Sequence, residues 1–121
     1  MKRKQIYKDD GTPYLTKEGE PIFENTLELG DSFIPKINKP IVKEGKFINY
    51  SIPVDLIDKD KNKFEGIFIK LTPTQAQSIS TTEDANQKLF KTYSYKNEFG
   101  EFISVTANEF KEAKTLKDFG F

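Results

Sequence analysis

The chain has 121 residues, of which 36% are hydrophobic and 31% charged, and its 19 Lys and Arg residues balance its 19 Asp and Glu residues. This length fits one domain with a core of modest size. Cysteine and histidine are absent, which excludes disulfides, thiolate metal sites, Ser–His–Asp catalysis and HExxH zinc sites. No apolar run reaches membrane length and the opening MKRK lacks the apolar stretch of a secretion signal, so we expect a cytoplasmic protein.

Residues 1–26 contain a short near-repeat with turn-forming residues. The stretch Gly11–Thr12–Pro13–Tyr14 is echoed eight residues later by Gly19–Glu20–Pro21–Ile22. Asp-Gly and Glu-Gly pairs favour turns, and each proline is unsuited to a central strand. We expect a small exposed hairpin or a flexible arm, followed by a domain over residues 27–107.

The domain begins with a predicted strand at Ser32–Asn38 and a lysine-rich loop at Asn38–Lys46. The clearest strand is Phe47–Ile57, where apolar residues from Ile48 to Leu56 alternate with mostly polar ones. This period of two predicts one buried and one solvated face. Pro53 within the run suggests an edge position or a bulge.

A polar turn at Asp58–Lys63 leads to a partner strand, Phe64–Leu71. We expect Ile67, Ile69 and Leu71 to face the core. Phe64, Phe68 and Lys70 would then share the outer face, an assignment that a one-residue shift in register would reverse.

The next stretch, TPTQAQSI, predicts a helix, with Thr72 as N-cap, Pro73 at the first position and Gln75 three residues after the cap. Two strands, Leu89–Asn97 and Gly100–Ala107, form a last hairpin. The remaining residues, 108–121, are expected to form a short amphipathic helix over 109–119 with Asn108 as its cap.

The order of these elements is strand, strand, strand, helix, strand, strand. It predicts a mainly β protein and resembles an OB-fold, a five-stranded Greek-key barrel with a helix between strands three and four, here with a short C-terminal helix appended. Across residues 27–107 the chain is similar to the single-stranded-DNA-binding OB-fold modules of bacteria, archaea and their viruses and plasmids.

That resemblance implies binding of single-stranded DNA, or RNA, without sequence preference, in replication, recombination or repair. Its groove would be made by strands two and three and the loops beside them. Carried onto this chain, it implicates Phe47, Phe64, Phe68 and Lys70, with Lys39, Lys43 and Lys46 in the flanking loop. A replication protein or a second copy of the chain would be a further partner, and no cofactor is implied.

The aromatic residues support the same expectation independently. The 11 Phe and 5 Tyr outnumber the rings that a small core can hold beside its aliphatic residues. Lys91, Tyr93, Tyr95 and Phe102 on the last hairpin combine rings with ammonium groups, which suits base stacking and phosphate contact. The alternative is a β-rich interaction or structural protein of a virus or plasmid, whose exposed rings contact another protein chain.

Carboxylates offer the remaining route to catalysis. Asp58, Asp60 and Asn62 match the first ligands of a calcium loop, but Lys63 stands where glycine is required and Ile69 where the bidentate glutamate belongs. Asp55, Asp58, Asp60 and Glu65 are close in sequence, as a magnesium-dependent nuclease would need, yet nothing in their spacing indicates convergence. We therefore expect no enzyme and no metal site.

Overall fold

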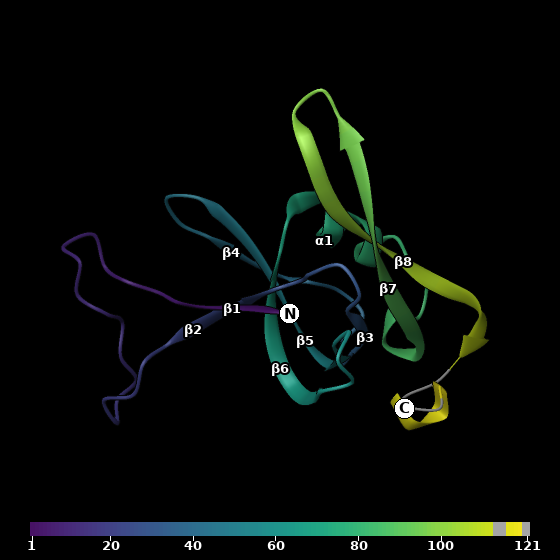
Figure 1. Ribbon diagram of the computed structural model, residues 1–121, viewed down its shortest axis with the longest axis horizontal. Coiled ribbons are helices and arrows are strands. Elements are labelled where there is room, and N and C mark those ends of the chain that lie inside the picture. The colour runs from purple at the N-terminus through teal and green to yellow at the C-terminus, as the bar shows by residue number, and fades with distance from the viewer. Residues whose placement is uncertain (113–115, 120–121) are drawn as a thin grey trace.

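The structure is a computed structural model that describes residues 1–112 and 116–119 (Figure 1). Within these residues the chain is mainly β, as expected, with eight strands, one α-helix and two 3₁₀ helices. In chain order they are β1 (Lys2–Gln5), β2 (Phe23–Thr26), β3 (Ser32–Pro35), β4 (Ile41–Glu44), β5 (Ile48–Ile57), β6 (Lys63–Leu71), α1 (Pro73–Ser80), η1 (Ala85–Gln87), β7 (Lys88–Asn97), β8 (Gly100–Glu112) and η2 (Leu116–Phe119). Among the described residues, no helix is long and apolar enough to cross a bilayer.

These strands form a single sheet with the order β1-β2-β6-β5-β3-β7-β8, and β4 also pairs with β5. Neighbouring strands are antiparallel except β2 and β6, which are parallel where Thr26 pairs with Lys70. The long strand β5 pairs with β6 along one edge and with both β3 and β4 along the other. The sheet curls into an open half-barrel, from which the β7–β8 hairpin projects (Figure 1).

The core lies inside the half-barrel. Ile52, Val54 and Leu56 of β5 are fully buried, which confirms the predicted inward face over that part of the strand. Phe33 of β3 stacks on Phe90 of β7, with ring centroids 5.3 Å apart and planes inclined by 9°. Burying a side chain of this size contributes about 1.5–3 kcal/mol, so the aliphatic row and the ring pair carry much of the folding energy.

The structure has a strand, β4, where the sequence predicted only a loop at Asn38–Lys46. β3 and β4 lie along the same edge of β5, separated by residues 36–40. Pro53 of β5 faces this interruption, where its carbonyl accepts a hydrogen bond from Lys36 N (2.9 Å). Because proline has no N–H to donate, the ladder cannot continue there, and the chain leaves β5 before rejoining it as β4.

The expected position of Phe64 on the outer face is wrong. Its side chain is half-buried and packs against the core. The cause is a break in register between Val54 and Leu56, where Gly66, at φ +62°, donates its N–H to Asp55 Oδ1 (2.9 Å). Such a bulge exchanges the two faces of the strand on either side of it.

The expected C-terminal helix over 109–119 is also wrong for its first turn. Residues 109–112 continue β8, and Glu112 pairs with Lys88 of β7. Strand pairing overrides the helical propensity of this stretch. Leu116 of η2 then packs in a second buried cluster with Ile34, Ile57 and Leu89; the rest of the predicted helix, at 113–115, lies outside the described residues.

Helix α1 begins as the sequence predicted and links the two parts of the sheet. Thr72 Oγ1 accepts from Gln75 N (3.2 Å) and Gln75 Oε1 accepts from Thr72 N (3.0 Å), a complete capping box. The buried Gln75 side chain also donates Nε2 to the carbonyl of Ile103 on β8 (2.9 Å). One side chain therefore fixes the start of the helix and attaches it to the β7–β8 hairpin.

The N-terminal segment is attached to the sheet at its start and at its end. At its start, the amino group of Met1 donates to Asp31 Oδ1 (2.7 Å) and lies 3.3 Å from Glu28 Oε1. At its end, β2 pairs with both β1 and β6. Between them, residues 6–22 extend away from the half-barrel (Figure 1).

We expect Asp31→Ala to lower the free energy of unfolding by about 2–3 kcal/mol, because it removes the buried carboxylate that accepts from both the Met1 ammonium and Glu28 N. Glu28→Ala is the matched control, since its side chain is 46% exposed and such a partner contributes at most about 1 kcal/mol. Urea unfolding followed by circular dichroism measures both. Equal losses in the two variants would contradict this account of the N-terminus.

We expect Gln75→Ala to destabilise the protein by about 1–2 kcal/mol, since it removes half of the capping box and the bond to Ile103 O. Gln77→Ala, on the exposed side of the same helix, controls for helix propensity and should change stability by less than about 0.5 kcal/mol. The same urea titration compares them, and a loss in Gln77→Ala as large as in Gln75→Ala would refute the role assigned to Gln75.

Candidate functional site

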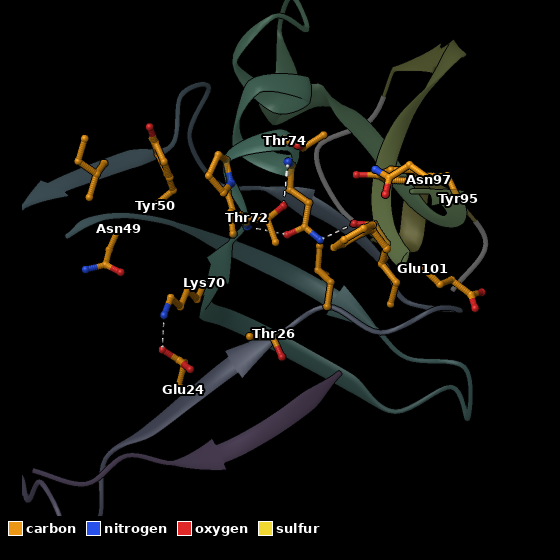
Figure 2. A pocket seen from close by; sticks show the side chains of 17 residues that line it. Glu24, Thr26, Asn49, Tyr50, Lys70, Thr72, Thr74, Tyr95, Asn97 and Glu101 are labelled. Atoms are coloured by element: carbon orange, nitrogen blue, oxygen red, sulfur yellow. Dashed lines mark hydrogen bonds and ion pairs between the residues drawn. The ribbon is translucent and has the colours of Figure 1, made fainter. Parts of the chain in front are cut away.

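A groove with a volume of 860 Å³ lies between the β7–β8 hairpin and the end of the β5–β6 pair, with the start of α1 between them (Figure 2). Leu71–Gln75 form its floor. Glu24, Thr26 and Leu27 close one end. Its walls are Ile48, Asn49, Tyr50 and Lys70 on one side, and Tyr95, Asn97, Glu101, Phe102 and Ile103 on the other.

The hairpin wall carries a row of rings. Tyr95 and Phe102 are cross-strand partners with centroids 5.8 Å apart, and Tyr93 follows 6.3 Å from Tyr95. Tyr93 and Phe102 are exposed and Tyr95 is half-buried. Alternation along β7 places Lys91 on the same face, so three rings and one ammonium group lie along this surface, and two of the rings reach the groove.

The opposite wall combines one cation with one acid. Lys70 Nζ on β6 lies 3.1 Å from Glu24 Oε1 on β2, and both side chains are partly exposed. Phe68, two residues earlier on β6, shares the outer face with Lys70 and is 56% exposed. A ligand that crosses this wall would meet a flat apolar surface and a cation within one strand.

The tips of two hairpins add further exposed rings. At the β4–β5 turn, Phe47 is 71% exposed and Lys46 Nζ lies 5.8 Å from its ring centroid. Lys43 lies on β4 opposite Asn49 of β5. At the β7–β8 turn, Phe99 is 81% exposed.

The predicted site residues are therefore distributed over several places. Lys70, Tyr95 and Phe102 line the groove together. Phe68, Lys91 and Tyr93 lie on strands next to these residues, and Phe47, Lys43 and Lys46 lie on the β4–β5 hairpin. Two do not join them. Phe64 packs in the core, and Lys39 Nζ donates to the carbonyl of Ser80 at the end of α1.

The structure adds groove residues that sequence reasoning did not single out, chiefly Glu24, Tyr50 and Asn97. Tyr50 belongs to the predicted inward face of β5 and packs against the core, but it is only half-buried and also lines the groove. No local signal marks Glu24, because its place depends on the parallel pairing of β2 with β6.

The carboxylate of Asp58 accepts hydrogen bonds from the backbone of its own turn. Asp58 Oδ1 accepts from Asp60 N and Asn62 N, both at 2.9 Å. Desolvation raises the pKa of Asp58, but the hydrogen bonds from Asn62 and Asp60 outweigh it and hold the pKa below its usual value. Asp55 is paired with Lys36 Nζ at 2.7 Å. Within residues 1–112 and 116–119, no three acidic side chains are grouped to hold a metal ion.

Comparisons with protein-family models, with curated proteins and with solved structures found no match to this chain.

Proposed function

We propose that this chain binds single-stranded nucleic acid, DNA or RNA, without sequence preference and without catalysing a reaction. The observation that carries the proposal is a set of solvent-exposed rings in and near the groove, most of them close to a cation along the chain: Phe68 two residues from Lys70, Phe47 next to Lys46, Tyr93 two residues from Lys91, and Phe102 in the groove wall. Every base offers a flat face, so stacking on such rings accepts any sequence and contributes roughly 1–3 kcal/mol per base.

The strand pairings support an OB-like interpretation of the half-barrel. When β3 and β4 are counted as one interrupted strand, the first strand pairs with the second (β5) and with the fourth (β7). The second pairs with the third (β6), and the fourth with the fifth (β8). Helix α1 lies between the third and the fourth. In OB-folds the face of strands two and three, with the loops after strands one and four, binds oligonucleotides. Those places correspond to the β5–β6 face, the turn with Phe47 and the turn with Phe99.

The charges favour contact at a few points rather than general attraction. The chain has no net charge, so a polyanion is held by local cations, and Lys70, Lys43 and Lys46 are the exposed ones nearest to the rings of the β5–β6 side. The chain has a single arginine, Arg3, and therefore few of the bidentate groups that read guanine edges. Contact with phosphates and base faces, without readout of base edges, fits this set of side chains.

Such a protein would protect or present single strands in replication, recombination or repair, in the cytoplasm, for a cell, a virus or a plasmid. The second candidate function is contact with another protein chain, either a replication protein or a second copy. It is favoured by the exposed apolar side chains of the projecting N-terminal segment, Tyr7, Tyr14 and Leu15.

Titration of a fluorescent oligo-dT tests the nucleic-acid proposal. We expect binding at micromolar protein in low salt, with tyrosine quenching, weaker binding to a duplex of the same length, and a negative slope of log affinity against log salt of about 0.7 per phosphate contact. Absence of binding in low salt would exclude this function and leave the protein-contact candidate. Equal affinity for the duplex would indicate charge attraction alone.

We expect Phe68→Ala and Phe102→Ala each to weaken oligo-dT binding about tenfold or more, because each removes a stacking surface. Their urea midpoints should stay close to that of the wild type, since both rings are exposed. Tyr14→Ala, an exposed ring on the projecting segment, is the matched control and should leave binding unchanged. An equal loss in Tyr14→Ala would show that the groove is not the site.

A further inference from the structure

The ion pair between Glu24 and Lys70 places a carboxylate at the cation that the proposed ligand would use. Lys70 Nζ lies 3.1 Å from Glu24 Oε1, and both residues line the groove (Figure 2). A phosphate that approaches Lys70 would meet this acid first. A carboxylate in direct contact with Lys70 weakens the attraction of this lysine for a polyanion, so its presence in such a site calls for an explanation.

The position of Glu24 is fixed by the backbone around it. Thr26 pairs with Lys70 in the parallel bridge between β2 and β6, and Asn25 Nδ2 donates to the carbonyl of Phe68 (3.1 Å). Residues 25 and 26 are thus attached to the strand that carries Phe68 and Lys70. The side chain of Glu24 can rotate away from Lys70, but its Cα stays beside the groove.

We propose that Glu24 is a built-in competitor for phosphate at Lys70, an inference that rests on the proposed function. In the free protein the Glu24 carboxylate is paired with the Lys70 ammonium. When an oligonucleotide binds, one of its phosphate oxygens takes the place of the carboxylate. A partly exposed ion pair shifts an equilibrium by no more than about fivefold, so the competition is mild and reversible.

The consequence is that a ligand needs contacts besides the one with Lys70. Inorganic phosphate gains one contact with Lys70 and must displace Glu24 for it. An oligonucleotide also stacks on the rings of β6 and of the β7–β8 hairpin, and that added free energy exceeds the cost of displacing one exposed carboxylate. Glu24 therefore lowers the affinity of every phosphate ligand for Lys70, and only a ligand with further contacts keeps a useful affinity.

The experiment is a double-mutant cycle with Glu24→Gln, Lys70→Gln and the double variant, titrated with the same oligo-dT. Glutamine keeps the shape of each side chain while it removes the charge. We expect Glu24→Gln to bind about three- to fivefold tighter, Lys70→Gln to bind more weakly, and the Glu24 substitution to give little gain when Lys70 is already replaced. Thymidine monophosphate, titrated alone, should gain affinity by a similar factor of about three to five in Glu24→Gln.

Glu101→Gln, the other carboxylate that lines the groove, separates a specific competitor from general charge. Its gain should be smaller and should persist in the Lys70→Gln background. If Glu24→Gln binds no tighter than the wild type, or gains equally with and without Lys70, the inference is wrong while the proposed function stands. If the wild-type protein binds no oligo-dT, both fail.

Discussion

The stacked rings of Phe33 and Phe90 hold the two parts of the sheet together. β3 and β7 share only two paired positions, and Phe33 with Phe90 is one of them. Through this short ladder the β7–β8 hairpin joins the strands that precede it. Both rings are fully buried. Their packing stabilises the junction between β3 and β7, where the short ladder provides few hydrogen bonds.

This arrangement determines where the other rings lie. The core around Phe33 and Phe90 is completed by aliphatic residues of β5 and β6, such as Ile52 and Ile69. A close-packed interior accepts no further large side chain without strain. Phe102 therefore remains outside in the wall of the groove, and Phe68 remains outside on the same face of β6 as Lys70.

The sequence predicted those parts of the fold that depend on local pattern. Alternation in β5 placed Ile52, Val54 and Leu56 in the core, and the cap residues Thr72 and Gln75 located the start of α1. Features that depend on distant pairing were missed. The exposed strand β4 exists because β5 offers it a partner, and residues 109–112 extend a strand because β7 lies beside them.

The same distinction applies to the candidate site. Lys70 and Phe68 were placed correctly on the outer face because they follow the regular part of β6. Phe64, on the same strand, was misplaced since the bulge at Asp55 and Gly66 shifts the register before it. Glu24 could not be found from its neighbours in sequence, because it reaches the groove only through the pairing of β2 with β6.

The free edges of the sheet have a consequence for how copies of the chain behave at high concentration. β1 forms one outer edge, and three consecutive cations, Lys2, Arg3 and Lys4, lie along it. A second molecule that aligned its own β1 there would bring like charges into register. At the other edge, the Ile103 carbonyl of β8 is already occupied by Gln75. A second strand could therefore add neither at β1 without charge repulsion nor at the Ile103 carbonyl without displacing Gln75.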